Sequence, residues 1–139
     1  MKLLGKILLA TDFSKPAEDA LQSAIAVAKA FHSTIILMHV FPEELPALDR
    51  DRATTAITEE LHSIQARIAA EGLEAPQPIR EYGSPFVHIV QQADFIDANV
   101  IMLGSGEGNR LSVTAGKVMR KAYKPVWVVK TGFTPPFKR

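Results

Sequence analysis

The sequence contains no cysteine among its 139 residues. This absence excludes a disulfide framework, a thiolate zinc site, an iron–sulfur cluster and a catalytic thiol. The four histidines lack the close spacing of a local metal-ligand motif, such as two histidines four positions apart. We therefore expect neither a structural nor a catalytic metal.

An excess of charge of one sign is also lacking. The chain has 16 basic and 15 acidic residues, which gives a formal net charge of +1. This balance provides no electrostatic footprint for a nucleic acid or a membrane surface, so we expect neither as a partner.

Long hydrophobic runs are missing as well. No apolar stretch approaches the roughly 20 residues that a membrane helix needs. The basic and then apolar start of the chain stops at Asp12 without a signal-peptide cleavage pattern, and it is more typical of a buried strand. The prediction is a soluble, cytoplasmic protein.

Apolar material is nevertheless plentiful, since hydrophobic residues make up 47% of the chain. That composition and length indicate one globular domain with a core of its own. We expect this domain to span residues 1–130. The last nine residues, 131–139, carry two prolines and no hydrophobic period, and they are predicted to form a loose tail.

Short β-rich runs alternate with helical patterns along the chain. The predicted strands are Ile7–Ala10, Thr34–Val40, Pro78–Tyr82, Val100–Leu103 and Val126–Val129. The predicted helices begin after Ser14, near Asp49, near Phe86 and near Thr114, and a loop is expected over Phe41–Leu48. Strands joined through helices form parallel β-α-β crossovers, so the pattern predicts an α/β fold with helices on both faces of a parallel sheet.

Two loops at the predicted carboxyl ends of strands contain residues suited to a ligand, and this is the edge where open α/β sheets bind ligands. Asp12 follows the first strand, where its carboxylate suits a ribose or a base N–H, or else supports the amino end of the next helix. The glycine-rich run 104–108 precedes Arg110, Ser112 and Thr114 and suits a phosphate, although such runs are also flexible connections. It matches neither a Walker A loop nor a dinucleotide fingerprint. His39, among apolar neighbours, is expected to be a core or rim histidine.

Several segments together resemble universal stress proteins. In chain order they are Lys6–Ser14, Ile36–Val40, Gly83–Pro85, Val100–Ser105, Lys117–Lys121 and Lys124–Val129. The resemblance implies a three-layer, doubly wound, five-stranded parallel sheet of order 3-2-1-4-5, similar to the adenine nucleotide alpha hydrolases. It also implies a homodimer formed through the last strand.

Some members of that family bind ATP and others do not. The resemblance assigns Asp12 and Val40 to the adenosine and the pattern G-x2-G-x9-G-[ST] to the phosphates. Gly104 matches the first glycine of this pattern, but Glu107 stands at the second, the third glycine is missing, and the loop is about five residues short. Gly106, Gly108, Ser112 and Thr114 offer a different cradle. The candidate ligand-binding residues are Thr11, Asp12, Val40, Gly104, Gly106, Gly108, Ser112 and Thr114.

Two regulatory functions remain open. One is a stress-response regulator that binds ATP, AMP or another adenine nucleotide at the carboxyl ends of the strands, and the other is a nucleotide-free protein-interaction dimer. An enzyme is disfavoured. An ATP pyrophosphatase needs a glycine-rich loop after the first strand, a phosphoacceptor domain needs paired acids there, and no convergent acid–base pair is present, although slow ATP hydrolysis stays open.

Overall fold

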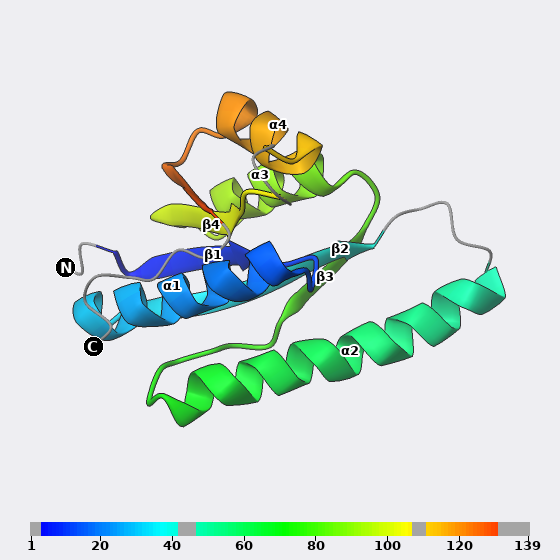
Figure 1. The fold of residues 1–139 in the computed structure, drawn as a ribbon, viewed down its shortest axis with the longest axis horizontal. Helices are drawn as coiled ribbons and strands as arrows, with labels where there is room; N and C mark the ends of the chain where they lie inside the picture. The colour runs from blue at the N-terminus through cyan, green and yellow to red at the C-terminus, as the bar shows by residue number, and fades with distance from the viewer. Residues whose placement is uncertain (1–3, 42–46, 107–110, 131–139) are drawn as a thin grey trace.

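The computed structural model describes residues 4–41, 47–106 and 111–130 and has the predicted α/β architecture (Figure 1). Five parallel strands form one sheet of order β3-β2-β1-β4-β5. The strands are β1 (Lys6–Ala10), β2 (Thr34–Phe41), β3 (Ile79–Tyr82), β4 (Val100–Gly104) and β5 (Val126–Val129). The helices are α1 (Lys15–Phe31), α2 (Ala47–Ala70), α3 (Pro85–Phe95) and α4 (Val113–Lys121). The predicted strand order is confirmed.

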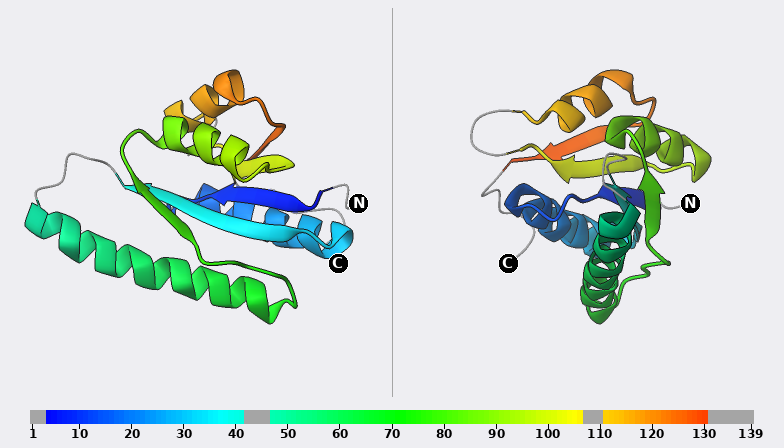
Figure 2. Two further views of the ribbon diagram at one scale, coloured as in Figure 1. Left: turned by 180° about the vertical axis from the view of Figure 1, so that it is seen from behind. Right: turned by 90° about the vertical axis from the view of Figure 1, so that its right-hand side faces the viewer.

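The sheet lies between two pairs of helices. Helices α1 and α2 are on one face and α3 and α4 are on the other, as the views from behind and from the side show (Figure 2). Each face has its own hydrophobic cluster, one including Ile7 and Leu9 and the other including Leu8 and Ala10. Successive residues of a strand point to opposite faces, and both faces of β1 are covered, which explains its uninterrupted apolar run.

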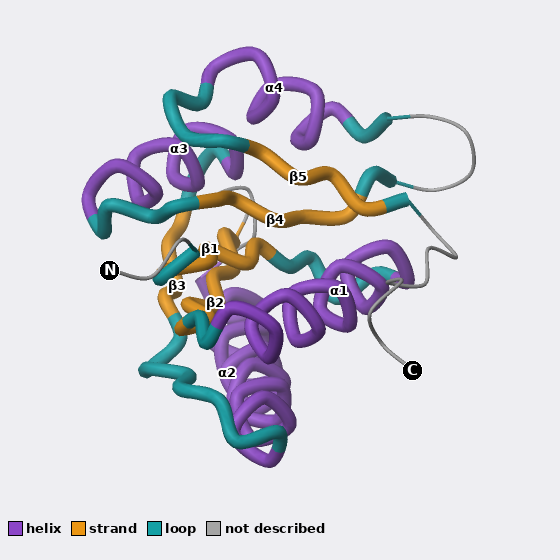
Figure 3. Tube along the Cα trace, turned by 90° about the vertical axis from the view of Figure 1, so that its left-hand side faces the viewer, coloured by secondary structure: helices purple, strands orange, loops and turns teal. Residues whose placement is uncertain are grey.

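The central strand β1 marks the point where the chain changes direction across the sheet. Leu8 pairs with Ile36 of β2 on one side and with Ile101 of β4 on the other. The chain proceeds from β1 through β2 to β3, then crosses to β4 and continues to β5 (Figure 3). This reversal leaves room for a ligand beyond the carboxyl ends of β1 and β4.

The helix boundaries follow local signals. The Ser14 hydroxyl accepts a hydrogen bond of 3.3 Å from the Ala17 amide, and Pro16 lies in the first turn of α1, where its missing N–H costs little. Helix α2 ends just before Gly72, whose φ of +79° lies in the left-handed region that glycine adopts readily.

The predicted loop Phe41–Leu48 was wrong at both ends, and at its far end α2 already begins at Ala47. Phe41 was expected in a loop, yet it is the last residue of β2 and is fully buried. The reason is pairing with β3, because Phe41 lies opposite Tyr82 and its carbonyl accepts a hydrogen bond from the Gly83 amide. The hydropathy pattern of one strand does not show how far its hydrogen bonding with a neighbouring strand continues.

The predicted tail 131–139 lies outside the described residues, so its looseness stays a prediction. Among the residues described, no helix is long and apolar enough to cross a membrane.

Candidate functional site

A cleft opens at the carboxyl ends of β1 and β4, where the strand order reverses. Its empty volume is about 610 Å³, which includes space open to solvent. The first turns of α1, α3 and α4 contribute to its walls through Pro16, Pro85 and Thr114. Helix amino ends carry partial positive charge, so the cleft suits a ligand with an anionic group.

The cleft gathers nearly all of the residues predicted from the sequence. Those that line it are Thr11, Asp12, Val40, Gly104, Gly106, Ser112 and Thr114. Gly108 lies outside the described residues. The loop after β1 and the segment around position 106 therefore meet over one cleft.

The loop after β1 is held by bonds between its own side chains and backbone. The Asp12 carboxylate accepts hydrogen bonds at Oδ1 from the Ser14 amide at 3.0 Å and from the Ser14 hydroxyl at 2.5 Å. The Thr11 hydroxyl accepts one from the Phe13 amide at 3.1 Å. Asp12 therefore supports the amino end of α1, which is the structural role that the sequence offered as an alternative to ligand binding. Its exposed carboxylate also lines the cleft.

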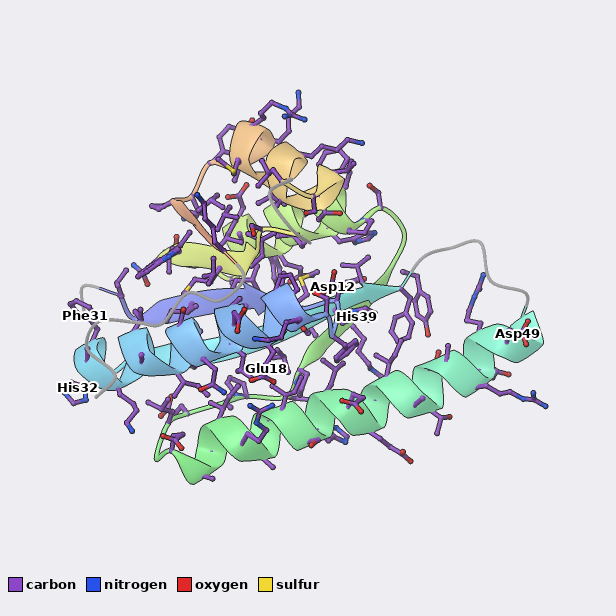
Figure 4. The ribbon with its side chains drawn as sticks, in the orientation of Figure 1. Asp12, Glu18, Phe31, His32, His39 and Asp49 are labelled. Atoms are coloured by element: carbon purple, nitrogen blue, oxygen red, sulfur yellow. The ribbon has the colours of Figure 1, made fainter. Side chains whose placement is uncertain are left out.

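His39 connects this loop to β2. Its Nδ1 lies 2.7 Å from the Thr11 carbonyl oxygen, and its residue is buried with 8% of its surface exposed. Figure 4 shows Asp12 and His39 close together at the amino end of α1. Burial lowers the pKa of the imidazole, and the Thr11 carbonyl and the Asp12 carboxylate act in the opposite direction to a smaller extent. The prediction of a core or rim histidine is confirmed.

The floor of the cleft is apolar and was missed in the sequence. It includes Met38, Ile89 and Leu103, all buried in the cluster between the sheet and α3 and α4. Met38 lies on the same face of β2 as Val40, and Ile89 lies one helical turn after Pro85, so each shares a face with another residue of the cleft. Ordinary core residues show the same spacings, so the sequence alone does not single these residues out. An apolar floor beneath polar walls suits a flat base attached to a polar sugar.

Gly104 has a packing role that its position in the phosphate pattern did not predict. A Cβ at this residue would lie 2.6 Å from the Pro16 carbonyl carbon and 2.7 Å from its Cβ and O atoms. The end of β4 and the first turn of α1 can approach this closely only without a side chain at position 104.

The amino end of α4 forms the opposite wall. The Ser112 hydroxyl accepts a hydrogen bond of 3.0 Å from the Ala115 amide and caps the helix. The Ser112 amide donates a hydrogen bond of 2.6 Å to the Ser105 carbonyl, so the end of β4 and the start of α4 lie next to each other. Gly106 has a φ of +108°, which favours glycine there.

Ionisable groups are scarce in the cleft. Of the described residues that line it, only Asp12 and His39 have ionisable side chains. Across the described ranges no group of three or more His, Cys, Asp or Glu residues could hold a metal ion. The cleft is equipped to bind a ligand through packing, hydrogen bonds and helix dipoles.

Fold and cleft together define a doubly wound α/β protein with a ligand cleft at its switch point. The chain belongs to the universal stress protein family, whose model matches residues 4–130. No match was found among curated proteins.

Solved structures agree with this family. Protein MJ0577 is 28% identical, with a TM-score of 0.78 over 95% of this chain and 99% of that one. A universal stress protein from Archaeoglobus fulgidus in complex with dAMP is 28% identical, with a TM-score of 0.70 over 94% of this chain and 100% of that one. Another universal stress protein, in complex with cAMP, is 18% identical, with a TM-score of 0.76 over 93% and 98%, and supports the fold alone.

Proposed function

We propose that this universal stress protein is a regulatory protein that binds an adenine nucleotide, such as AMP or ATP, in the cleft at the carboxyl ends of β1 and β4. The observation that carries the proposal is the cleft itself, where Asp12, an apolar floor and the amino ends of three helices face one space. The adenine fits against the apolar floor, the ribose hydroxyls against Asp12, and the phosphate near Ser112 and Thr114.

The relative from Archaeoglobus fulgidus supports this choice of ligand, since that protein was solved with dAMP. The regulatory role rests on the composition of the cleft. Hydrolysis needs a positioned base and usually a metal. Asp12, the exposed carboxylate of the cleft, already accepts two hydrogen bonds from Ser14 at one of its oxygens. We therefore propose binding without turnover, in a protein that stays in the cytoplasm.

Calorimetric titration with AMP, ATP and cytidine monophosphate tests the proposal. We expect the adenine nucleotides to bind and the Asp12→Ala variant to bind them at least about tenfold more weakly, which is the loss of one hydrogen bond to a charged group. Asp94→Ala is the matched control, because Asp94 is an exposed carboxylate at the far end of α3. No binding of AMP or ATP at millimolar concentration by the parent would reject the nucleotide and leave the nucleotide-free interaction protein.

We also propose that two copies pair through β5. This strand is at the edge of the sheet, hydrogen-bonded to β4 only, and its residues Val126, Trp127 and Val128 are partly exposed. An edge strand of this kind is a template for another strand. The Pro125 carbonyl accepts a bond from the Ile101 amide of β4, and the Val129 carbonyl accepts one from the Ser105 amide just after β4. Alternation along β5 therefore directs the Val128 amide away from β4.

Sedimentation velocity over a range of concentrations tests the pairing. Val128→Pro removes one outward N–H while the bonds to β4 stay, so we expect a folded variant that dissociates at a higher concentration than the parent. A parent that sediments as a monomer throughout would reject the dimer and leave the nucleotide proposal untouched.

A further inference from the structure

His39 is a buried, titratable side chain that makes none of the ligand contacts proposed above. Its Nδ1 lies 2.7 Å from the carbonyl oxygen of Thr11, which can only accept a hydrogen bond, so Nδ1 carries the hydrogen. This bond crosses from β2 to the last residue before the Asp12 loop. It therefore fixes the backbone at the point where the chain leaves the sheet and enters the cleft wall.

The imidazole also packs between two aromatic rings. Its centroid lies 4.8 Å from that of Phe13, at 45°, and 5.0 Å from that of Phe41, at 77°. Phe41 in turn stacks on Tyr82 at 4.7 Å, so the row of rings continues to the neighbouring strand. Phe13, which belongs to the loop, is thereby packed against a rigid part of the sheet.

Phe13 is held in a backbone conformation that side chains rarely adopt. Its φ is +65°, in the left-handed region, where the side chain of a residue other than glycine crowds the backbone. Such a conformation persists where the surroundings fix it. Here the surroundings are the His39 ring and the bond from the Phe13 amide to the Thr11 hydroxyl. Because Phe13 lies between Asp12 and Ser14, its conformation places the Ser14 amide and hydroxyl where they bond to the Asp12 carboxylate.

We infer that His39 is a positioning residue for nucleotide binding, and that its hydrogen bond to the Thr11 carbonyl holds the Thr11–Ser14 loop in the shape that presents Asp12 to the ligand. The inference rests on the proposed function for its effect on affinity. Its structural part, the order of the loop, can be measured without any ligand.

Two variants separate the hydrogen bond from the ring contact. His39→Asn keeps an N–H donor at the position of Nδ1 and removes the ring, and His39→Phe keeps a ring and removes the donor. For His39→Phe we expect AMP affinity to fall about fivefold to tenfold, the equivalent of one net hydrogen bond. For His39→Asn we expect a loss below about threefold, because the donor is retained. Equal losses in both variants, or none in either, would overturn the inference.

Ile35→Val is the matched control for stability. Ile35 is fully buried near the other end of β2, where it pairs with Ile7 of β1, so its truncation should lower the melting temperature without changing the loop. We expect AMP affinity in this variant to stay within about twofold of the parent. An affinity loss equal to that of His39→Phe would show that general destabilisation explains both, which would also overturn the inference.

Amide hydrogen exchange provides the measurement free of ligand. In His39→Phe we expect the amides of Phe13 and Ser14, which bond to Thr11 and Asp12 within the loop, to exchange at least about fivefold faster than in the parent. In His39→Asn they should exchange more slowly than in His39→Phe, because the donor is retained, and the amide of Leu8 should exchange at the parent's rate in every variant. Unchanged exchange in His39→Phe rejects the positioning role whether or not nucleotide binds. If the parent protein binds no nucleotide but protection is lost only in His39→Phe, the proposed function is rejected and the structural part of the inference is kept.

Discussion

The two walls of the cleft are built in different ways. The wall after β1 consists of side chains that bond to nearby backbone, with Asp12 to Ser14, Thr11 to Phe13, and His39 to Thr11. The wall after β4 depends on the absence of a side chain at Gly104 and on one cap, Ser112. The first wall depends on particular hydrogen-bonding side chains, while the second depends on close packing and on one helix end.

This difference bears on the ligand. The first wall matches the residues that the family resemblance assigns to the adenosine, and the second departs from the family's phosphate pattern. In this chain Gly104 is explained by its contact with Pro16 of α1, independently of any phosphate. A glycine that matches one position of a motif can therefore hold the fold together even where the rest of the motif is absent. The predictions below test each wall, from the largest expected effect to the smallest.

Gly104→Ala should have the largest effect. The new Cβ would lie 2.6–2.7 Å from Pro16 backbone and side-chain atoms, so β4 and the first turn of α1 must move apart. We expect a loss of about 2–3 kcal/mol in the free energy of unfolding, measured by urea denaturation. Loss of the contact between the walls should also weaken AMP binding.

Gly72→Ala is its matched control. A Cβ at Gly72 meets nothing within 4 Å, so only the φ of +79° opposes the substitution. We expect about 1 kcal/mol of destabilisation and unchanged AMP affinity. Equal losses at the two glycines would mean that the contact with Pro16 carries no special weight.

Ser112 offers a test confined to the second wall. Ser112→Ala removes the cap on the Ala115 amide and should cost about 1 kcal/mol, read from the same denaturation curves. Ser112→Asp keeps a capping oxygen and should restore stability, yet its negative charge should weaken AMP binding by repelling the phosphate. If Ser112→Asp bound AMP as well as the parent, the phosphate would lie elsewhere.

The smallest effect concerns pH and the first wall. Burial lowers the pKa of His39 in the folded protein below its ordinary value of 6.5, so the unfolded chain takes up this proton first as the pH falls. The stability linked to neutral His39 is therefore complete above about pH 6.5 and decreases as the pH drops toward the folded pKa. Melting curves of the parent from pH 7.5 to 5 should show this decrease, and His39→Asn should show a shallower one. Parallel curves would mean that His39 does not contribute to the pH dependence.

The fold was largely predictable because its signals are local. The apolar runs of Ile7–Ala10 and Val100–Leu103 indicate strands covered on both faces, and the helical segments between them require parallel crossovers. The meeting of Asp12 with the segment near Gly106 follows from the same topology. Phe41 was misassigned because its strand is extended by pairing with β3, which a single segment cannot show.

The functions of particular residues were harder to predict because they depend on contacts between distant segments. The role of Gly104 in β4 depends on Pro16 of α1, and that of His39 in β2 depends on Thr11 just after β1. The apolar floor was hidden because Met38 and Leu103 match the requirements of any core. Their place beneath a cleft is a property of the assembled sheet.

The 2.6 Å bond from the Ser112 amide to the Ser105 carbonyl also makes this part of the chain a natural point for engineering. Since the two ends of the intervening segment meet at their base, residues can be added between them without shifting β4 or α4, and the entropy of closing a longer segment grows only slowly with its length. A graft of a full glycine-containing loop at this place would turn the pocket of this chain into a test of how loop length selects among mono-, di- and triphosphates.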